Sequence, residues 1–97
     1  MRLGKENIKK INEYFKTKPV IKAYLFGSQA SGRATTDSDI DILVELDYNQ
    51  KLGLLFVQMQ LELEELLGRK VDLVSAKGIS KYIKPQVDKE KQLIYAR

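Results

Sequence analysis

The stretch that decides the fold reads Gly27-Ser28-Gln29-Ala30-Ser31-Gly32-Arg33-Ala34-Thr35-Thr36-Asp37-Ser38-Asp39-Ile40-Asp41. Glycine permits a tight turn and a close approach of the backbone to a phosphate, whose oxygens can accept hydrogen bonds from Ser28. Asp39 and Asp41 alternate with Ile40, so on a strand both carboxylates face the same way, about 6–7 Å apart along the backbone. Two carboxylates beside a phosphate-binding turn suit a hard divalent cation. The stretch therefore indicates a site for a nucleoside triphosphate.

Each part of this stretch is weak evidence alone, because a Gly-Ser turn is usually only a turn and an Asp-x-Asp is commonly a solvated strand end. The combination is stronger because the two parts lie between two hydrophobic runs. Two carboxylates that open an apolar strand repel each other and lose hydration, so without a cation they would reduce stability.

The spacing resembles the signature of the nucleotidyltransferase superfamily of the DNA polymerase beta type, in which Gly-Ser precedes Asp-x-Asp by about ten residues. More narrowly, residues 37–41 resemble those of minimal nucleotidyltransferases, the MntA-like antitoxins that pair with HEPN-domain toxins. The later Val71-Asp72-Leu73-Val74 also matches. The family often carries an arginine just before the second glycine, where this chain has Ser31, and Arg33 is the candidate substitute.

The resemblance implies a nucleotidyltransferase fold and a set of site residues. Gly27 and Ser28 would hold the β- and γ-phosphates of ATP, with Arg33 as a further phosphate contact. Asp39 and Asp41 would bind Mg²⁺, and Asp72 would help a second ion or take the proton from the acceptor. The implied reaction transfers AMP to a tyrosine hydroxyl of a HEPN-type RNase toxin, so the chain would act as an antitoxin.

Length and composition are consistent with this reading. The 97 residues predict a single domain, 1–97, and contain no cysteine and no histidine. Catalysis must therefore use carboxylates, hydroxyls, lysines, arginines and a metal held by oxygen, for which magnesium is the best match. No apolar run reaches the length of a membrane span and no secretion signal is evident, so we expect a cytoplasmic protein.

The charge is unevenly placed along the chain. Residues 1–18 hold six basic and two acidic residues, residues 19–76 hold five and nine, and residues 77–97 hold six and two. The basic ends could steer a triphosphate, or bind an acidic partner or nucleic acid. Two alternatives to the enzyme follow: an inert antitoxin that neutralises its toxin by binding, and a nucleic-acid-binding protein, which lacks a recognisable reading motif.

Hydrophobic periodicity predicts helices over about 4–17, 50–67 and 79–91, and strands over 20–26, 40–46 and 71–74. Pro85 requires the last helix to bend or to start only near that residue. We expect Leu93, Ile94 and Tyr95 to pack the chain end back onto the body. The order predicts an α/β (α+β) fold, a small mixed sheet with helices packed on one side.

The helix predicted over 50–67 carries more apolar residues than one buried face requires. Its main stripe predicts a core face. Leu54, Val57 and Leu61 lie off that stripe. They could contact a partner or a second copy of the chain, or they could widen the core face.

Overall fold

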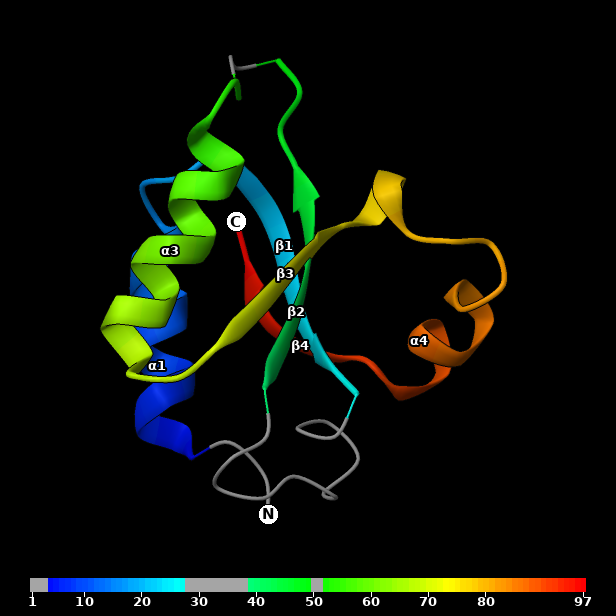
Figure 1. Cartoon of the computed structure of the whole chain (residues 1–97), viewed down its shortest axis with the longest axis horizontal. Coiled ribbons are helices and arrows are strands. Elements are labelled where there is room, and N and C mark those ends of the chain that lie inside the picture. The colour runs from blue at the N-terminus through cyan, green and yellow to red at the C-terminus, as the bar shows by residue number, and fades with distance from the viewer. Residues whose placement is uncertain (1–3, 28–38, 50–51) are drawn as a thin grey trace.

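The computed structural model describes residues 4–27, 39–49 and 52–97. Its centre is a mixed four-stranded sheet in the order β3-β2-β1-β4 (Figure 1). The strands are β1 (Val20–Phe26), β2 (Ile40–Leu46), β3 (Val71–Ser75) and β4 (Gln92–Ala96). β1 is antiparallel to both β2 and β4, whereas β3 is parallel to β2. The mixed sheet is as predicted, but β4 is a full edge strand where the sequence indicated only a packed end.

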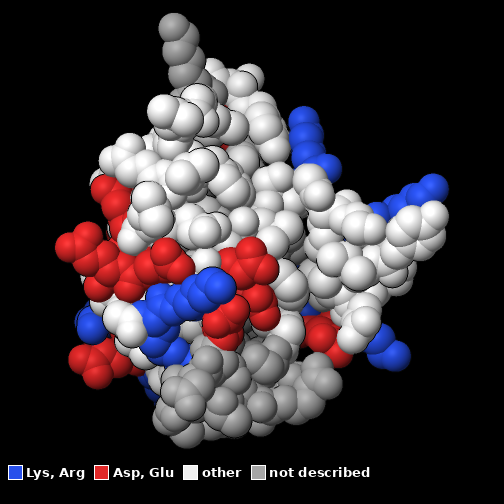
Figure 2. All heavy atoms as spheres, viewed as in Figure 1, with Lys and Arg blue, Asp and Glu red and all other residues white. Residues whose placement is uncertain are grey.

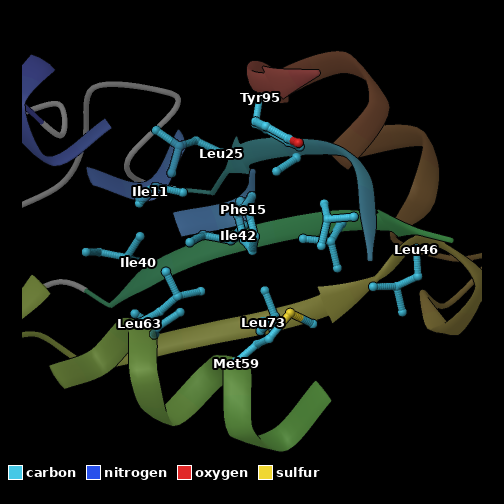
Figure 3. Packing of buried hydrophobic residues seen from close by; sticks show 14 residues of the cluster. Ile11, Phe15, Leu25, Ile40, Ile42, Leu46, Met59, Leu63, Leu73 and Tyr95 are labelled. Atoms are coloured by element: carbon cyan, nitrogen blue, oxygen red, sulfur yellow. The ribbon is translucent and has the colours of Figure 1, made fainter. Parts of the chain in front are cut away.

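Two long helices cover one face of the sheet and enclose the core. α1 (Lys5–Phe15) contributes Ile11 and Phe15, and α3 (Leu55–Leu67) contributes Met59 and Leu63. These side chains meet alternate residues of β2, with Ile40 and Ile42 among them (Figure 3). The strand can place alternate residues in the core because successive side chains point to opposite faces. The other face of β2 is thereby left for Asp41, Leu43 and Glu45.

The last helix departs from the expected one-sided arrangement. α4 (Lys84–Glu90) has Pro85 in its first turn, which confirms a start near that residue. A short 3₁₀ helix, η1 (Ala76–Gly78), precedes it. Lys84 and Asp88 line a small cavity of about 130 Å³ together with Leu43 and Glu45 of β2. α4 therefore lies on the face of the sheet opposite α1 and α3 (Figure 1).

α3 ends as the sequence predicts, at Gly68, whose φ of 65° is left-handed. The residues off its main stripe are exposed: Leu54, Val57 and Leu61. The wider-core interpretation of these three residues is therefore wrong, and their apolar surface faces solvent in the isolated chain. None of the helices in the described parts of the chain is both long and apolar enough to cross a membrane.

Two neighbouring leucines of α3 give a direct test of this packing. Leu63 is 0 % exposed and Leu61 is 59 % exposed. Leu63→Ala should lower the free energy of unfolding by about 2–5 kcal/mol because it leaves a cavity in the core. Leu61→Ala should change it by about 0.5 kcal/mol or less. Urea denaturation of the two variants checks this, and equal losses would contradict the orientation of α3.

Candidate active site

The strand register brings the predicted acids to one end of the sheet. Asp41 of β2 pairs with Asp72 of the parallel strand β3. On its other side Asp41 pairs with Phe26, the last residue of β1. Asp39 lies two residues before Asp41, just ahead of the strand. Adjacent strands are about 4.8 Å apart, so the backbones that carry Asp41 and Asp72 are immediate neighbours.

The electrostatics of Asp41 reflect this crowding. Burial, together with the negative charges of Asp72 and Asp39, raises the pKa of Asp41 to about 6. Asp72 is exposed, because its neighbours Val71 and Leu73 point into the core. A cation near these groups would relieve the repulsion, so the donor set fits a hard metal ion that prefers oxygen ligands.

Gly27 follows β1 directly and lies against the same carboxylate. Its φ is 68°, which a residue with a side chain rarely adopts. A Cβ atom built on Gly27 would lie 2.5 Å from Oδ2 of Asp41. The sequence indicated that glycine is needed here for a close approach to phosphate. The structure adds a second reason, because a Cβ atom at this position would force the Asp41 carboxylate to move.

Two side chains of α3 hold the strand that carries Asp72, and the sequence reasoning missed them. The backbone N–H of Val71 donates to Oε2 of Glu64 at 3.0 Å. The N–H of Leu73 donates to Oε1 of Gln60 at 3.3 Å. These N–H groups flank Asp72 on the outer edge of β3, where no further strand pairs in the described sheet. The signal in the sequence is two polar residues four apart, beside the apolar stripe of the helix.

The remaining predicted site residues cannot be placed in the same way. Ser28, Ser31 and Arg33 lie outside the described residues. Within 4–27, 39–49 and 52–97, no three acidic side chains are arranged as a ready metal-binding group. A shared metal on Asp39, Asp41 and Asp72 therefore stays a prediction. Figure 2 shows acidic side chains gathered on one part of the surface.

Comparison with known proteins shows to which family the chain belongs. The family model described as polymerase beta, nucleotidyltransferase, matches residues 9–97. The chain belongs to the polymerase beta nucleotidyltransferase family. Asp39 just before β2, Asp41 on β2 and Asp72 on β3 thus lie in a nucleotidyltransferase domain, and the chain is a nucleotidyltransferase.

Comparison with individual relatives shows which members of this family the chain resembles. A Methanocaldococcus jannaschii protein, "Putative protein adenylyltransferase MJ1379", is 40% identical over 94 residues, which cover 94% of this chain and 92% of the relative. "Protein adenylyltransferase MntA" of Thermococcus cleftensis is 41% identical over 66 residues, covering 68% of this chain and 66% of that protein. The resemblance to MntA-like minimal nucleotidyltransferases is confirmed.

A solved structure supports the same fold. A crystal structure of a toxin–antitoxin complex with AMP-PNP contains a chain that superposes with a TM-score of 0.80 at 26% sequence identity. The match covers 94% of this chain and 74% of that chain. The nucleotidyltransferase fold predicted from the Gly-Ser and Asp-x-Asp stretch is therefore confirmed.

Gly27→Ala tests the contact with Asp41, and Gly68→Ala is its matched control. Both glycines have a left-handed φ, but a Cβ on Gly68 would meet nothing within 4 Å. Each variant should lose about 1–2 kcal/mol of stability from backbone strain. Only Gly27→Ala should also displace the carboxylate, and lower the affinity for Mg²⁺–AMP-PNP by tenfold or more in isothermal titration calorimetry. Equal affinities in the two variants would contradict a role for this contact.

Asp41→Asn tests the electrostatic cost of the site. The pKa of Asp41 in the folded chain lies above its ordinary value of 3.8, so ionisation of this group destabilises the fold once the pH rises through about 6. In chelator at pH 7 the variant should be more stable, by on the order of 1 kcal/mol after allowance for solvent screening.

Asp88→Asn is the control for that measurement, since hydrogen bonds from Lys84 and Lys91 lower the pKa of Asp88. This exposed control should show no gain in melting temperature. A lower melting temperature for Asp41→Asn than for the unaltered chain would contradict the repulsion.

Proposed function

We propose that this chain transfers AMP from ATP to a tyrosine hydroxyl of a HEPN-type RNase toxin, in a reaction that depends on Mg²⁺, and thereby acts as an antitoxin. The observation that carries the proposal is the pairing of Asp41 with Asp72 beside Gly27, at one end of a nucleotidyltransferase sheet. The names of the relatives, which specify protein adenylyltransferases, and the toxin–antitoxin neighbour with an ATP analogue support it.

The roles proposed for the residues are those that the family resemblance implies. The turn at Gly27 and Ser28 holds the β- and γ-phosphates, and Arg33 contacts phosphate. Asp39 and Asp41 would hold Mg²⁺, and Asp72 would help to hold a second ion or would accept the proton from the attacking hydroxyl. A bound Mg²⁺ would supply positive charge that stabilises the triphosphate and its leaving group. Positioning for in-line attack at the α-phosphorus supplies most of the rate.

Several features favour a protein acceptor. The described residues are used for one sheet, its helices and the acidic end of the site, which leaves little to shape a pocket for a small molecule. A tyrosine on a protruding or flexible segment of a partner needs no such pocket, because the partner's own structure can carry the hydroxyl to the α-phosphorus. Such a pair would act in the cytoplasm, where ATP and Mg²⁺ are both available.

The test is incubation of the purified chain with ATP, Mg²⁺ and a HEPN-domain toxin, followed by intact mass spectrometry. The partner should gain AMP units on a tyrosine, and chelator should abolish the gain. Asp39→Asn and Asp41→Asn should each lower the rate by at least about a hundredfold, because a cation ligand is lost. Asp88→Asn, on the exposed surface of α4, should retain full activity.

The alternative, an inert antitoxin that neutralises its toxin by binding, predicts the opposite results. If the partner gains no mass and Asp39→Asn neutralises the toxin as well as the unaltered chain does, neutralisation occurs by binding alone. Aminoglycosides and free nucleic acid ends should be poor acceptors under the same conditions.

A further inference from the structure

A basic segment projects from the sheet between β3 and β4. It comprises residues 76–91, namely η1, a turn and α4. It holds five lysines and two acidic residues: Lys77, Lys81, Lys84, Lys89, Lys91, Asp88 and Glu90. The segment lies away from α1 and α3 (Figure 1), and Figure 2 shows basic side chains projecting on that side. Its charge is thus opposite to that of the end of the sheet where Asp39, Asp41 and Asp72 lie.

Tyr82 is the most prominent side chain of this segment. It is 84% exposed, and the Nζ atom of Lys81 lies 5.5 Å from the centre of its ring. The backbone around it is ordered, because the N–H of Tyr82 donates to Oγ of Ser80 and the N–H of Lys84 donates to the Ser80 carbonyl. Within the described residues no hydrogen bond engages the Tyr82 hydroxyl, so it is available for reaction.

The other tyrosines are less accessible. The hydroxyl of Tyr14 donates to Glu62, and that of Tyr24 donates to Glu45 at 2.9 Å. Tyr95 lies in the core. Tyr48 is 48% exposed, and its ring lies under the Nζ atom of Lys77, at 4.1 Å from the ring centre. Tyr82 therefore has the largest exposed fraction of the five tyrosines, and it lies within the basic segment.

We propose that the chain adenylylates Tyr82 of a second copy of itself, an inference that rests on the proposed transfer of AMP to tyrosine. The basic segment of one copy complements the acidic end of the sheet in the other, and opposite charges favour such encounters. A second copy is the better acceptor because Tyr82 faces solvent in its own chain, where another molecule can reach it.

The reaction is the one proposed for the partner, with a different acceptor. The Tyr82 hydroxyl oxygen forms a bond to the α-phosphorus of ATP, and the bond from that phosphorus to the bridging oxygen of the leaving group breaks. Pyrophosphate leaves, and the phenolic proton passes to Asp72. The product is a phosphodiester with one negative charge, which reduces the positive charge of the basic segment by one.

The experiment incubates the full chain with ATP and Mg²⁺ and follows it by intact mass spectrometry, with peptide mapping of the product. The unaltered chain should gain one AMP unit on Tyr82, at a rate per molecule that rises with protein concentration. Tyr82→Phe should gain none, and its ring, Lys81 contact and fold should be unchanged. Tyr48→Phe is the matched control, since it removes another exposed tyrosine beside a lysine, and it should react like the unaltered chain.

The same preparations are also assayed on the HEPN-domain partner, which separates this inference from the proposed function. If the Tyr82→Phe variant still modifies the partner but gains no AMP itself, the proposal is supported. A chain that modifies its partner and gains no AMP overturns self-modification alone. Modification of neither protein overturns both proposals. Equal modification of Tyr82→Phe, or a rate per molecule that is independent of protein concentration, overturns Tyr82 of a second copy as the acceptor.

Discussion

The pairing of Asp41 with Asp72 across β2 and β3 is the constraint on which the site depends. Like charges on neighbouring strands oppose close pairing, so the strands must be held by something else. The core on the other face does this, because Ile40, Ile42, Val71 and Leu73 are all buried beneath α1 and α3. Because strand residues alternate between the two faces of the sheet, the same strands place apolar side chains that stabilise the fold on one face and carboxylates that destabilise it on the other.

Two further features of the structure, a glycine and a pair of side chains from α3, support the acidic face of the sheet. Gly27 leaves the space that the Asp41 carboxylate occupies, at the cost of a left-handed backbone conformation. Glu64 and Gln60 accept hydrogen bonds from the N–H groups on either side of Asp72, so α3 both covers the core and fixes the outer edge of β3. The backbone of β3 on either side of Asp72 is therefore held in place by α3, which reduces the reorganisation needed at the moment of reaction.

Most of the correct predictions of helices, strands and their ends came from short stretches of sequence. The apolar run in residues 40–46 predicted β2, and Gly68 correctly predicted where α3 ends. A start near Pro85, one of the two alternatives for the last helix, is the one that α4 adopts. β4 was missed because its pattern is short and mostly exposed, and its pairing with β1 depends on a contact across the whole chain. Gln60 and Glu64 were missed for a similar reason, since their partners are backbone groups of a later strand. The predicted roles of Ser28 and Arg33 still rest on the family resemblance.

The position of β4 also has a consequence for how the chain is made. β1 lies inside the sheet, between β2 near it in sequence and β4 at the other end of the chain, where Lys22 pairs with Ala96. While the chain emerges from a ribosome, one edge of β1 has no partner until residues 92–96 have been synthesised. An unpaired strand edge is a template for association with other chains. The growing chain is therefore most vulnerable to misassociation after α1 and α3 have been synthesised and before β4 can pair with β1.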